Sequence, residues 1–254
     1  MLKKVSLSLL VLLMALLGFM LYQAYGNGSK QLQVKSVTGV SVDANAVSER
    51  LARAVQAQTI STTPDKTASA EFDKLQAHLA ASFPLMHSTL KRETVGKHSL
   101  LFVWPGSDLA AKPIAVLAHQ DVVPVAPGTE ADWLAPPFAG VIKDGFVWGR
   151  GAWDNKGNLM GLCEAVELLL KSSFKPKQTV YLFFGHDEEI GGVEGAVAAV
   201  KLFQERKVQF SAVLDEGLLI TDGIMKGIDV PVALIGIAEK GYMTVEVSAK
   251  AVPG

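Results

Sequence analysis

The sequence has 254 residues, with 24 lysines and arginines against 25 aspartates and glutamates, which gives a formal net charge of −1. This balance leaves no basic excess to neutralise phosphates, and it argues against a nucleic-acid-binding protein. Hydrophobic residues make up 49% of the chain, as in globular rather than disordered proteins. Cys163 is the single cysteine. Any metal ion would therefore have to be held by histidine and carboxylate rather than by several thiolates.

An apolar run at the N-terminus predicts a membrane-directed segment. Lys3 and Lys4 precede the run VSLSLLVLLMALLGFMLY, which ends at Tyr22. A helix of about 18 residues is about 27 Å long, close to the hydrocarbon thickness of a bilayer. Residues 1–26 are therefore expected to be an uncleaved anchor, or a signal peptide cleaved near the small residues 24–26. Both alternatives place the rest of the chain on the outer side of the membrane, either anchored or secreted, because the two lysines favour an inside N-terminus.

The rest of the chain predicts an α/β protein. Residues 27–45 are expected to be a linker, and residues 45–57 and 66–82 have helical spacing. Further along, apolar runs that predict strands alternate with helical segments: SLLFVWPG, PIAVLAHQD, the helix NKGNLMGLCEAVELLLKS, TVYLFFGHDEE, the helix VEGAVAAVKLFQERK, and SAVLDEG. This alternation favours a parallel-rich mixed sheet between helices, with a catalytic domain over residues 46–238.

Polar residues gather where the predicted strands end. They are His119 with Asp121, Glu188 with Glu189, and Asp215 with Glu216, while Asp154 precedes a predicted helix. Each group alone has an ordinary explanation as a surface pair, a solvated loop or a helix cap. Together they lie at the carboxyl ends of the strands, where open parallel sheets bind their ligands. Histidine and carboxylate without thiolate suit a catalytic zinc site.

The spacing also suggests how these groups divide the work. Residues two apart on a strand face the same way, so Asp121 can reach the ring nitrogen of His119 that is remote from a metal. Adjacent glutamates in a turn point in different directions. One of them can therefore bind metal while its neighbour faces a water molecule.

Residues from about 46 to 254 resemble the cocatalytic-zinc exopeptidase family that contains carboxypeptidase S, Gly-X carboxypeptidase, aminoacylase and succinyl-diaminopimelate desuccinylase. The resemblance is carried by LAHQDVVPV, DWLAPPFAGVIKDGFVWGRGAWDNKG, FFGHDEEIGG and LDEG. The segments WGRGAWDNKG and GHDEEIGG are most similar to the branch of carboxypeptidase S and the N-acyl-amino-acid hydrolases.

The resemblance implies a zinc-exopeptidase fold with two zinc ions bridged by Asp154. It implies that His119 and Asp215 bind one zinc ion and that Glu189 binds the other. It makes Asp121 the residue that orients His119, and Glu188 the general base. The implied reaction is zinc-dependent hydrolysis of an amide bond next to a free carboxylate. The substrate would be a short peptide or an N-acyl amino acid, so that the enzyme is a carboxypeptidase, an N-acyl-amino-acid amidohydrolase, a dipeptidase or an aminoacylase.

The sequence departs from the family's pattern in its last part. Residues 239–254 are strand-like and resemble the opening of an inserted α+β domain, a lid through which many relatives form homodimers. No histidine follows His186, so the late histidine ligand and the substrate-facing histidine of the inserted domain are not in this sequence. Either the chain continues past Gly254 in a longer enzyme, or it is a catalytically incomplete, membrane-anchored binding module.

Other residues have simpler interpretations. His78, His87 and His98 are expected to be surface or packing residues, and Cys163 is expected to fill the core. The segment 133–138, which contains Trp133, is expected to form a packed loop near the cleft, with substrate contact as a secondary role.

Overall fold

The computed structural model describes residues 2–27, 34–35, 39–63, 66, 68–238, 241, 243 and 245–251. The chain divides into two compact units, Met1–Val42 and Asp43–Gly254. Part of the predicted linker, residues 28–33 and 36–38, lies outside the described residues.

The first unit contains a single long helix, α1 (Leu2–Gly26). Its segment Leu7–Gly26 is long and apolar enough to cross a membrane, and it is the only such helix among the residues that the structure describes. The side chains described along this segment are exposed. This agrees with the predicted length of the apolar run.

The second unit is built on a five-stranded mixed sheet with the order β1-β2-β6-β3-β7. Its strands are β1 (Lys91–Val95), β2 (Ser99–Trp104), β3 (Ile114–His119), β6 (Val180–Gly185) and β7 (Ala212–Leu214). Strands β6, β3 and β7 are parallel, whereas β2 is antiparallel to both β1 and β6. The register pairs His119 with Gly185, so β3 and β6 end side by side.

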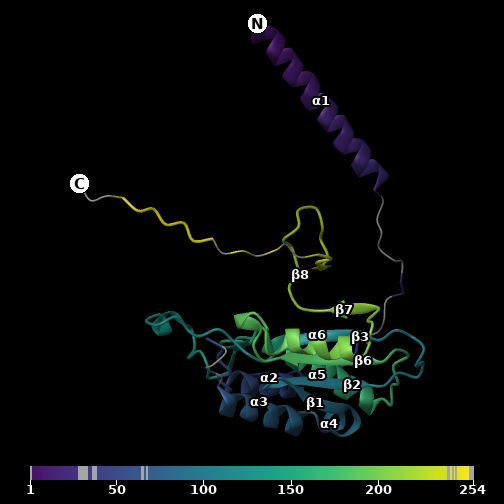
Figure 1. Cartoon of the computed structure of the whole chain (residues 1–254), viewed down its shortest axis with the longest axis vertical. Coiled ribbons are helices and arrows are strands. Elements are labelled where there is room, and N and C mark those ends of the chain that lie inside the picture. The colour runs from purple at the N-terminus through teal and green to yellow at the C-terminus, as the bar shows by residue number, and fades with distance from the viewer. Residues whose placement is uncertain are drawn as a thin grey trace. The chain divides into compact units, whose positions relative to one another are not determined.

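Different helices cover the two faces of this sheet (Figure 1). The helices are α2 (Ala44–Val55), α3 (Ser69–Ser82), α4 (Pro84–Thr89), α5 (Lys156–Lys171) and α6 (Ala196–Glu205). On β6, Leu182 and Phe184 belong to the core that α2, α3, α4 and α5 cover, whereas Phe183 packs with Phe203 of α6. Cys163 of α5 is fully buried in the first of these cores, as predicted.

The chain path explains why α5 and α6 lie on opposite faces. The connection from β3 through α5 to β6 moves across the sheet in one direction, and the connection from β6 through α6 to β7 returns in the other. Crossovers between parallel strands are almost always right-handed, so a reversal of direction puts the second helix on the other face. The predicted α/β fold with a mixed sheet between helices is confirmed.

Smaller elements lie in the connections. β4 (Val141–Lys143) and β5 (Phe146–Trp148) form a hairpin whose two-residue turn, Asp144 and Gly145, has positive φ at both positions. An Asp-Gly pair favours this kind of turn. The short helices η1 (Glu130–Asp132) and η2 (Glu188–Ile190) precede and follow this region, and β8 (Ile220–Thr221) pairs with β9 (Val232–Ala233).

The strand-like character predicted for residues 239–254 is not found in the described part of that segment. Residues 241, 243 and 245–251 lie in neither helix nor strand. A strand requires hydrogen bonding to a neighbouring strand, and these described residues have no such neighbour. The domain boundary near residue 239 stays a prediction.

Candidate active site

His119 ends strand β3 with its ring between two groups of carboxylates. The residue is only 2% exposed. On one side, its Nε2 atom lies 2.9 Å from Asp154 Oδ1, 3.4 Å from Glu216 Oε1 and 3.7 Å from Glu188 Oε2. On the other side, its Nδ1 atom faces Asp121. One ring nitrogen is thus held by the protein, and the other points into an acidic cavity.

Asp121 connects the ends of β3 and β6. Its Oδ1 atom lies 3.2 Å from His119 Nδ1 and accepts the backbone N–H of Glu188 at 3.2 Å. Its Oδ2 atom accepts the backbone N–H of Glu189 at 3.1 Å. The side chain is fully buried, so these donors are its hydrogen-bonding environment. The structure therefore brings Asp121 to the ring nitrogen predicted from the two-residue spacing, and it also shows a contact with the glutamate turn that the spacing did not indicate.

Among the residues that the structure describes, two sets of side chains could each hold a metal ion. One set is His119, Asp154 and Glu216, and the other is His119, Glu188 and Glu189; in each set the ligand atoms lie within 4.8 Å of one another. The two sets share the histidine. Each set therefore offers an imidazole nitrogen and carboxylate oxygens, which are ligand atoms that zinc binds in proteins.

Asp215 lies in the same acidic cavity, and its role as a ligand stays a prediction. It lines the same cavity of about 60 Å³ as His119, Glu188 and Glu216, but it belongs to neither metal-compatible set. Its Oδ1 atom accepts the backbone N–H of Glu216 at 2.9 Å. The residue that approaches His119 from this segment is Glu216, which the sequence placed at the strand end without giving it a role.

The clustered charges shift the protonation of the site. Burial lowers the pKa of His119, but the hydrogen bonds and charges of Asp121 and Glu216 outweigh it and raise the pKa to about 11. Burial, reinforced by nearby carboxylates, raises the pKa of Glu188 and raises that of Glu189 to about 7. Two glutamates with raised pKa values, close to further carboxylates around a buried histidine, mark a place that favours a bound cation.

The two residues that follow Asp154 make buried hydrogen bonds next to the cluster. Asn155 is buried, and its Oδ1 atom accepts the backbone N–H of His119 at 3.3 Å. Lys156 is fully buried, and its Nζ atom donates to the carbonyl oxygen of Ala57. Burial lowers the pKa of Lys156 to about 7. These contacts fix the entrance of α5, and sequence analysis assigned no role to either residue.

The remaining histidines make other contacts. His186 is buried with Ser99 Oγ 2.6 Å from its Nδ1 atom. His78 donates to the carbonyl oxygen of Arg50, and His87 donates to that of Phe83. His98 stacks on Phe72 with 5.1 Å between ring centroids. Neither metal-compatible set among the described residues includes any of the four.

A comparison of the sequence with protein families identifies the family of this chain. A family model described as peptidase family M20/M25/M40 matches residues 115–250, more than half of the chain. The chain belongs to this family. The match starts in β3 and includes every residue of the acidic cavity named above.

Individual relatives in peptidase family M20/M25/M40 agree with this membership. The chain is 45% identical to the N-fatty-acyl-amino acid synthase/hydrolase PM20D1.1 of Danio rerio over 79% of this chain and 39% of the relative. It is 39% identical to carboxypeptidase S of Saccharomyces cerevisiae over 80% of this chain and 37% of the relative. The chain thus spans about two fifths of the length of the curated relatives it matches.

Solved structures of the family share the fold. Human carnosine dipeptidase 1 matches 70% of this chain with a TM-score of 0.55 at 21% identity. The M20 family metallo-carboxypeptidase Sso-CP2 of Sulfolobus solfataricus matches 67% with a TM-score of 0.53 at 24% identity. These likenesses confirm that the mixed sheet and its helices have the family's architecture.

Proposed function

We propose that this chain provides the metal-binding part of a zinc-dependent hydrolase that cleaves an amide bond next to a free carboxylate. The observation that carries the proposal is the direction of the His119 ring, whose Nε2 atom faces Asp154, Glu188 and Glu216 within 3.7 Å while Asp121 holds Nδ1. The names of the relatives support an N-acyl amino acid or a short peptide as substrate. Of these, the relative with 45% identity favours the N-acyl amino acid.

The donor set supports zinc as the metal. It consists of one imidazole nitrogen and several carboxylate oxygens, and Cys163 is buried in the core away from the set. We propose two zinc ions bridged by Asp154, with His119 and Asp215 on one ion and Glu189 on the other. Glu216 is a further candidate because its Oε1 atom lies 3.4 Å from His119 Nε2 and it forms a metal-compatible set with His119 and Asp154. When bound, zinc would polarise the amide carbonyl and lower the pKa of water.

The protein's own groups have separate tasks in this proposal. Asp121 holds His119 in the tautomer that leaves Nε2 free to act as a ligand. Glu188 accepts a proton from the attacking water on a carboxylate oxygen and delivers it to the leaving nitrogen. Burial and neighbouring carboxylates raise the pKa of Glu188 above its ordinary value, which brings this group closer to the neutral range where a general base works best.

The proposal is tested with Glu188→Gln in the full chain. The variant keeps the size of the side chain but cannot accept the proton, so we expect bound zinc to remain and turnover of an N-acyl amino acid to fall by about 10²–10⁴-fold. Glu205→Gln on α6 is the control, and it should change neither quantity. Zinc is counted by elemental analysis, and hydrolysis is followed by the released amine. An active Glu188→Gln protein contradicts the role of Glu188, and a wild-type chain that binds zinc without turnover supports the binding-module alternative.

We also propose that α1 directs the second unit to the outer side of a membrane, as an anchor or as a signal sequence. The support is the apolar segment Leu7–Gly26 together with Lys3 and Lys4 before it. Protease protection in sealed vesicles tests the orientation, and the mass of the mature protein separates an anchor from a cleaved signal. A homodimer through a domain that begins near residue 239 is a further proposal, and its test is the oligomeric state in solution.

A further inference from the structure

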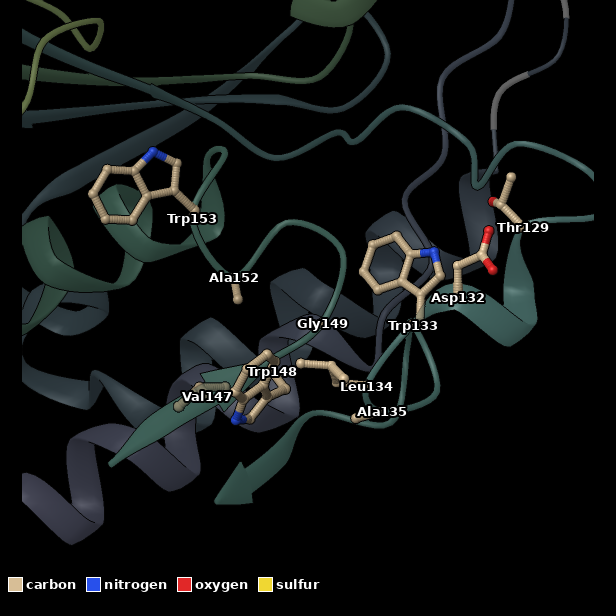
Figure 2. A pocket seen from close by; sticks show the side chains of 10 residues that line it. All are labelled: Thr129, Asp132, Trp133, Leu134, Ala135, Val147, Trp148, Gly149, Ala152 and Trp153. Atoms are coloured by element: carbon tan, nitrogen blue, oxygen red, sulfur yellow. The ribbon is translucent and has the colours of Figure 1, made fainter. Parts of the chain in front are cut away.

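An aromatic pocket of about 440 Å³ lies beside the candidate active site. Trp133, Trp148 and Trp153 line it together with Leu134, and Figure 2 shows these side chains around the same space. They are three of the four tryptophans of the chain; the fourth, Trp104, is buried in the core. A volume of this size, with mostly apolar and aromatic walls, is typical of a site for a small organic group.

The pocket and the metal-compatible cluster have neighbouring residues of the chain in their walls. Trp153 is the residue before Asp154, whose Oδ1 atom lies 2.9 Å from His119 Nε2. Consecutive Cα atoms are only about 3.8 Å apart across a trans peptide bond and closer across a cis one. The wall of the pocket at Trp153 therefore begins one residue from Asp154, a proposed metal ligand.

The apolar character of the walls favours the acyl end of an N-acyl amino acid over its carboxylate end. The described residues that line the pocket include one carboxylate, Asp132, and no lysine or arginine. The guanidinium of the nearby Arg150 lies over the ring of Trp133, 5.1 Å from its centroid. A neutral acyl chain can be covered by these mostly apolar walls without losing the hydration of a charge, whereas a carboxylate would have to pair with Arg150 beside Trp133.

The exposure of the walls points the same way. Leu134 is 83% exposed and Trp153 is 74% exposed, although both are large and apolar. Covering such surface with an apolar ligand is favourable in proportion to the area removed from water. The pocket therefore gains more from a long acyl chain than from an acetyl group.

We propose that this pocket is the subsite for the acyl chain of an N-acyl amino acid, and that Leu134 and the three tryptophans select long apolar chains. This inference rests on the proposed function, because it takes the substrate class from there.

The decisive experiment compares two substrates of the full chain that differ only in the acyl group, N-dodecanoyl-alanine and N-acetyl-alanine. Leu134→Glu places a charge in the pocket, so we expect kcat/KM for the dodecanoyl substrate to fall about tenfold or more while that for the acetyl substrate changes less than about twofold. Trp153→Ser should shift the same ratio. Leu109→Glu is the matched control, because Leu109 is 85% exposed and does not line the pocket. Equal loss for both substrates, or no loss for either, overturns the proposal.

A binding measurement separates a failure of this inference from a failure of the proposed function. Because three of the four tryptophans line the pocket, dodecanoyl-alanine below its micelle concentration should change the intrinsic fluorescence saturably in the wild type and in Trp104→Phe, but not in Leu134→Glu. Dodecanoate should compete, and alanine should not. If neither substrate is hydrolysed but this pattern holds, the proposed reaction fails and the acyl subsite stands. Competition by alanine, or no fluorescence change, overturns the subsite.

Discussion

The substitution Asp121→Asn removes the charge from a buried carboxylate that serves both strand ends of the site. The oxygens of Asp121 lie 3.2 Å from His119 Nδ1 and 3.2 and 3.1 Å from the backbone nitrogens of Glu188 and Glu189. All three partners are donors. Asparagine has one acceptor oxygen, so its amide group must face at least one of these N–H groups.

The cost of this change follows from the three contacts. A buried donor left without a partner costs about 1–3 kcal/mol, and a hydrogen bond to a neutral acceptor is about 1 kcal/mol weaker than one to a charged acceptor. We therefore expect Asp121→Asn to lower the free energy of unfolding by about 2–4 kcal/mol. The Nδ1 atom of His119 keeps the backbone carbonyl oxygen of Asp121, at 3.0 Å, but loses the charged carboxylate at 3.2 Å. The ring is then a poorer ligand, so zinc affinity should fall about 10–100-fold.

Asp187→Asn is the matched control in the neighbouring turn. Asp187 is also buried, but only its Oδ2 atom accepts a backbone N–H, that of Glu194 at 2.7 Å, and its Oδ1 atom has no hydrogen-bond partner. An amide group can replace that oxygen without facing a donor, so this variant should lose less than about 1 kcal/mol. Urea denaturation of the metal-free full chain and competitive zinc titration measure both effects. If Asp121→Asn is no less stable than Asp187→Asn and binds zinc as the wild type does, the reasoning about the shared carboxylate is refuted.

The other predictions concern stability. Gly140→Ala should lower the free energy of unfolding by about 2–5 kcal/mol, because φ is +62° and a Cβ atom would lie 2.2 Å from the carbonyl oxygen of Ala52. Gly145→Ala, with φ +81° and open space, should cost only about 1–2 kcal/mol in the same urea denaturation, and equal losses would contradict the clash. The Arg206 guanidinium lowers the pKa of Glu93 by its hydrogen bond. This pair therefore stabilises the fold fully above the unfolded-state pKa of Glu93, near 4.5. The stabilisation is lost as the pH falls through the lower folded-state pKa of Glu93. Glu93→Gln should remove that acid-dependent part, less than about 1 kcal/mol for a partly exposed pair, and an unchanged pH profile of stability would contradict it.

Sequence analysis located the elements whose own residues show an apolar run or a helical spacing of apolar residues. β2, β3 and β6 are continuous apolar runs because both faces of these strands are covered, and α5 and α6 have helical apolar spacing. β1 was not predicted. Its sequence, KRETV, is mostly polar and exposed, and it becomes a strand because it pairs along the edge of β2.

The candidate site follows the same rule. The two-residue spacing of His119 and Asp121 is local, so their proximity could be foreseen. Whether Asp215 or Glu216 turns toward His119 depends on the irregular backbone after β7, which has no period from which to read side-chain directions. The burial of Lys156 depends on Ala57, a partner 99 positions away along the chain. Contacts of this kind become visible only when the tertiary structure is known.

The path of the chain between β3 and α5 has an evolutionary consequence. His119 ends β3, and Asp154 lies two residues before α5, so both are fixed by elements that the hydrophobic core holds in place. The residues between them, including η1 and the β4–β5 hairpin, form a connecting segment that contains every residue lining the aromatic pocket. Insertions or exchanges within this connecting segment could remodel what the protein accepts without displacing the chemical groups at either end. A family with this layout can diversify its selectivity faster than its chemistry, and a designer who grafts a different connecting segment onto the same two anchor points would be following that route.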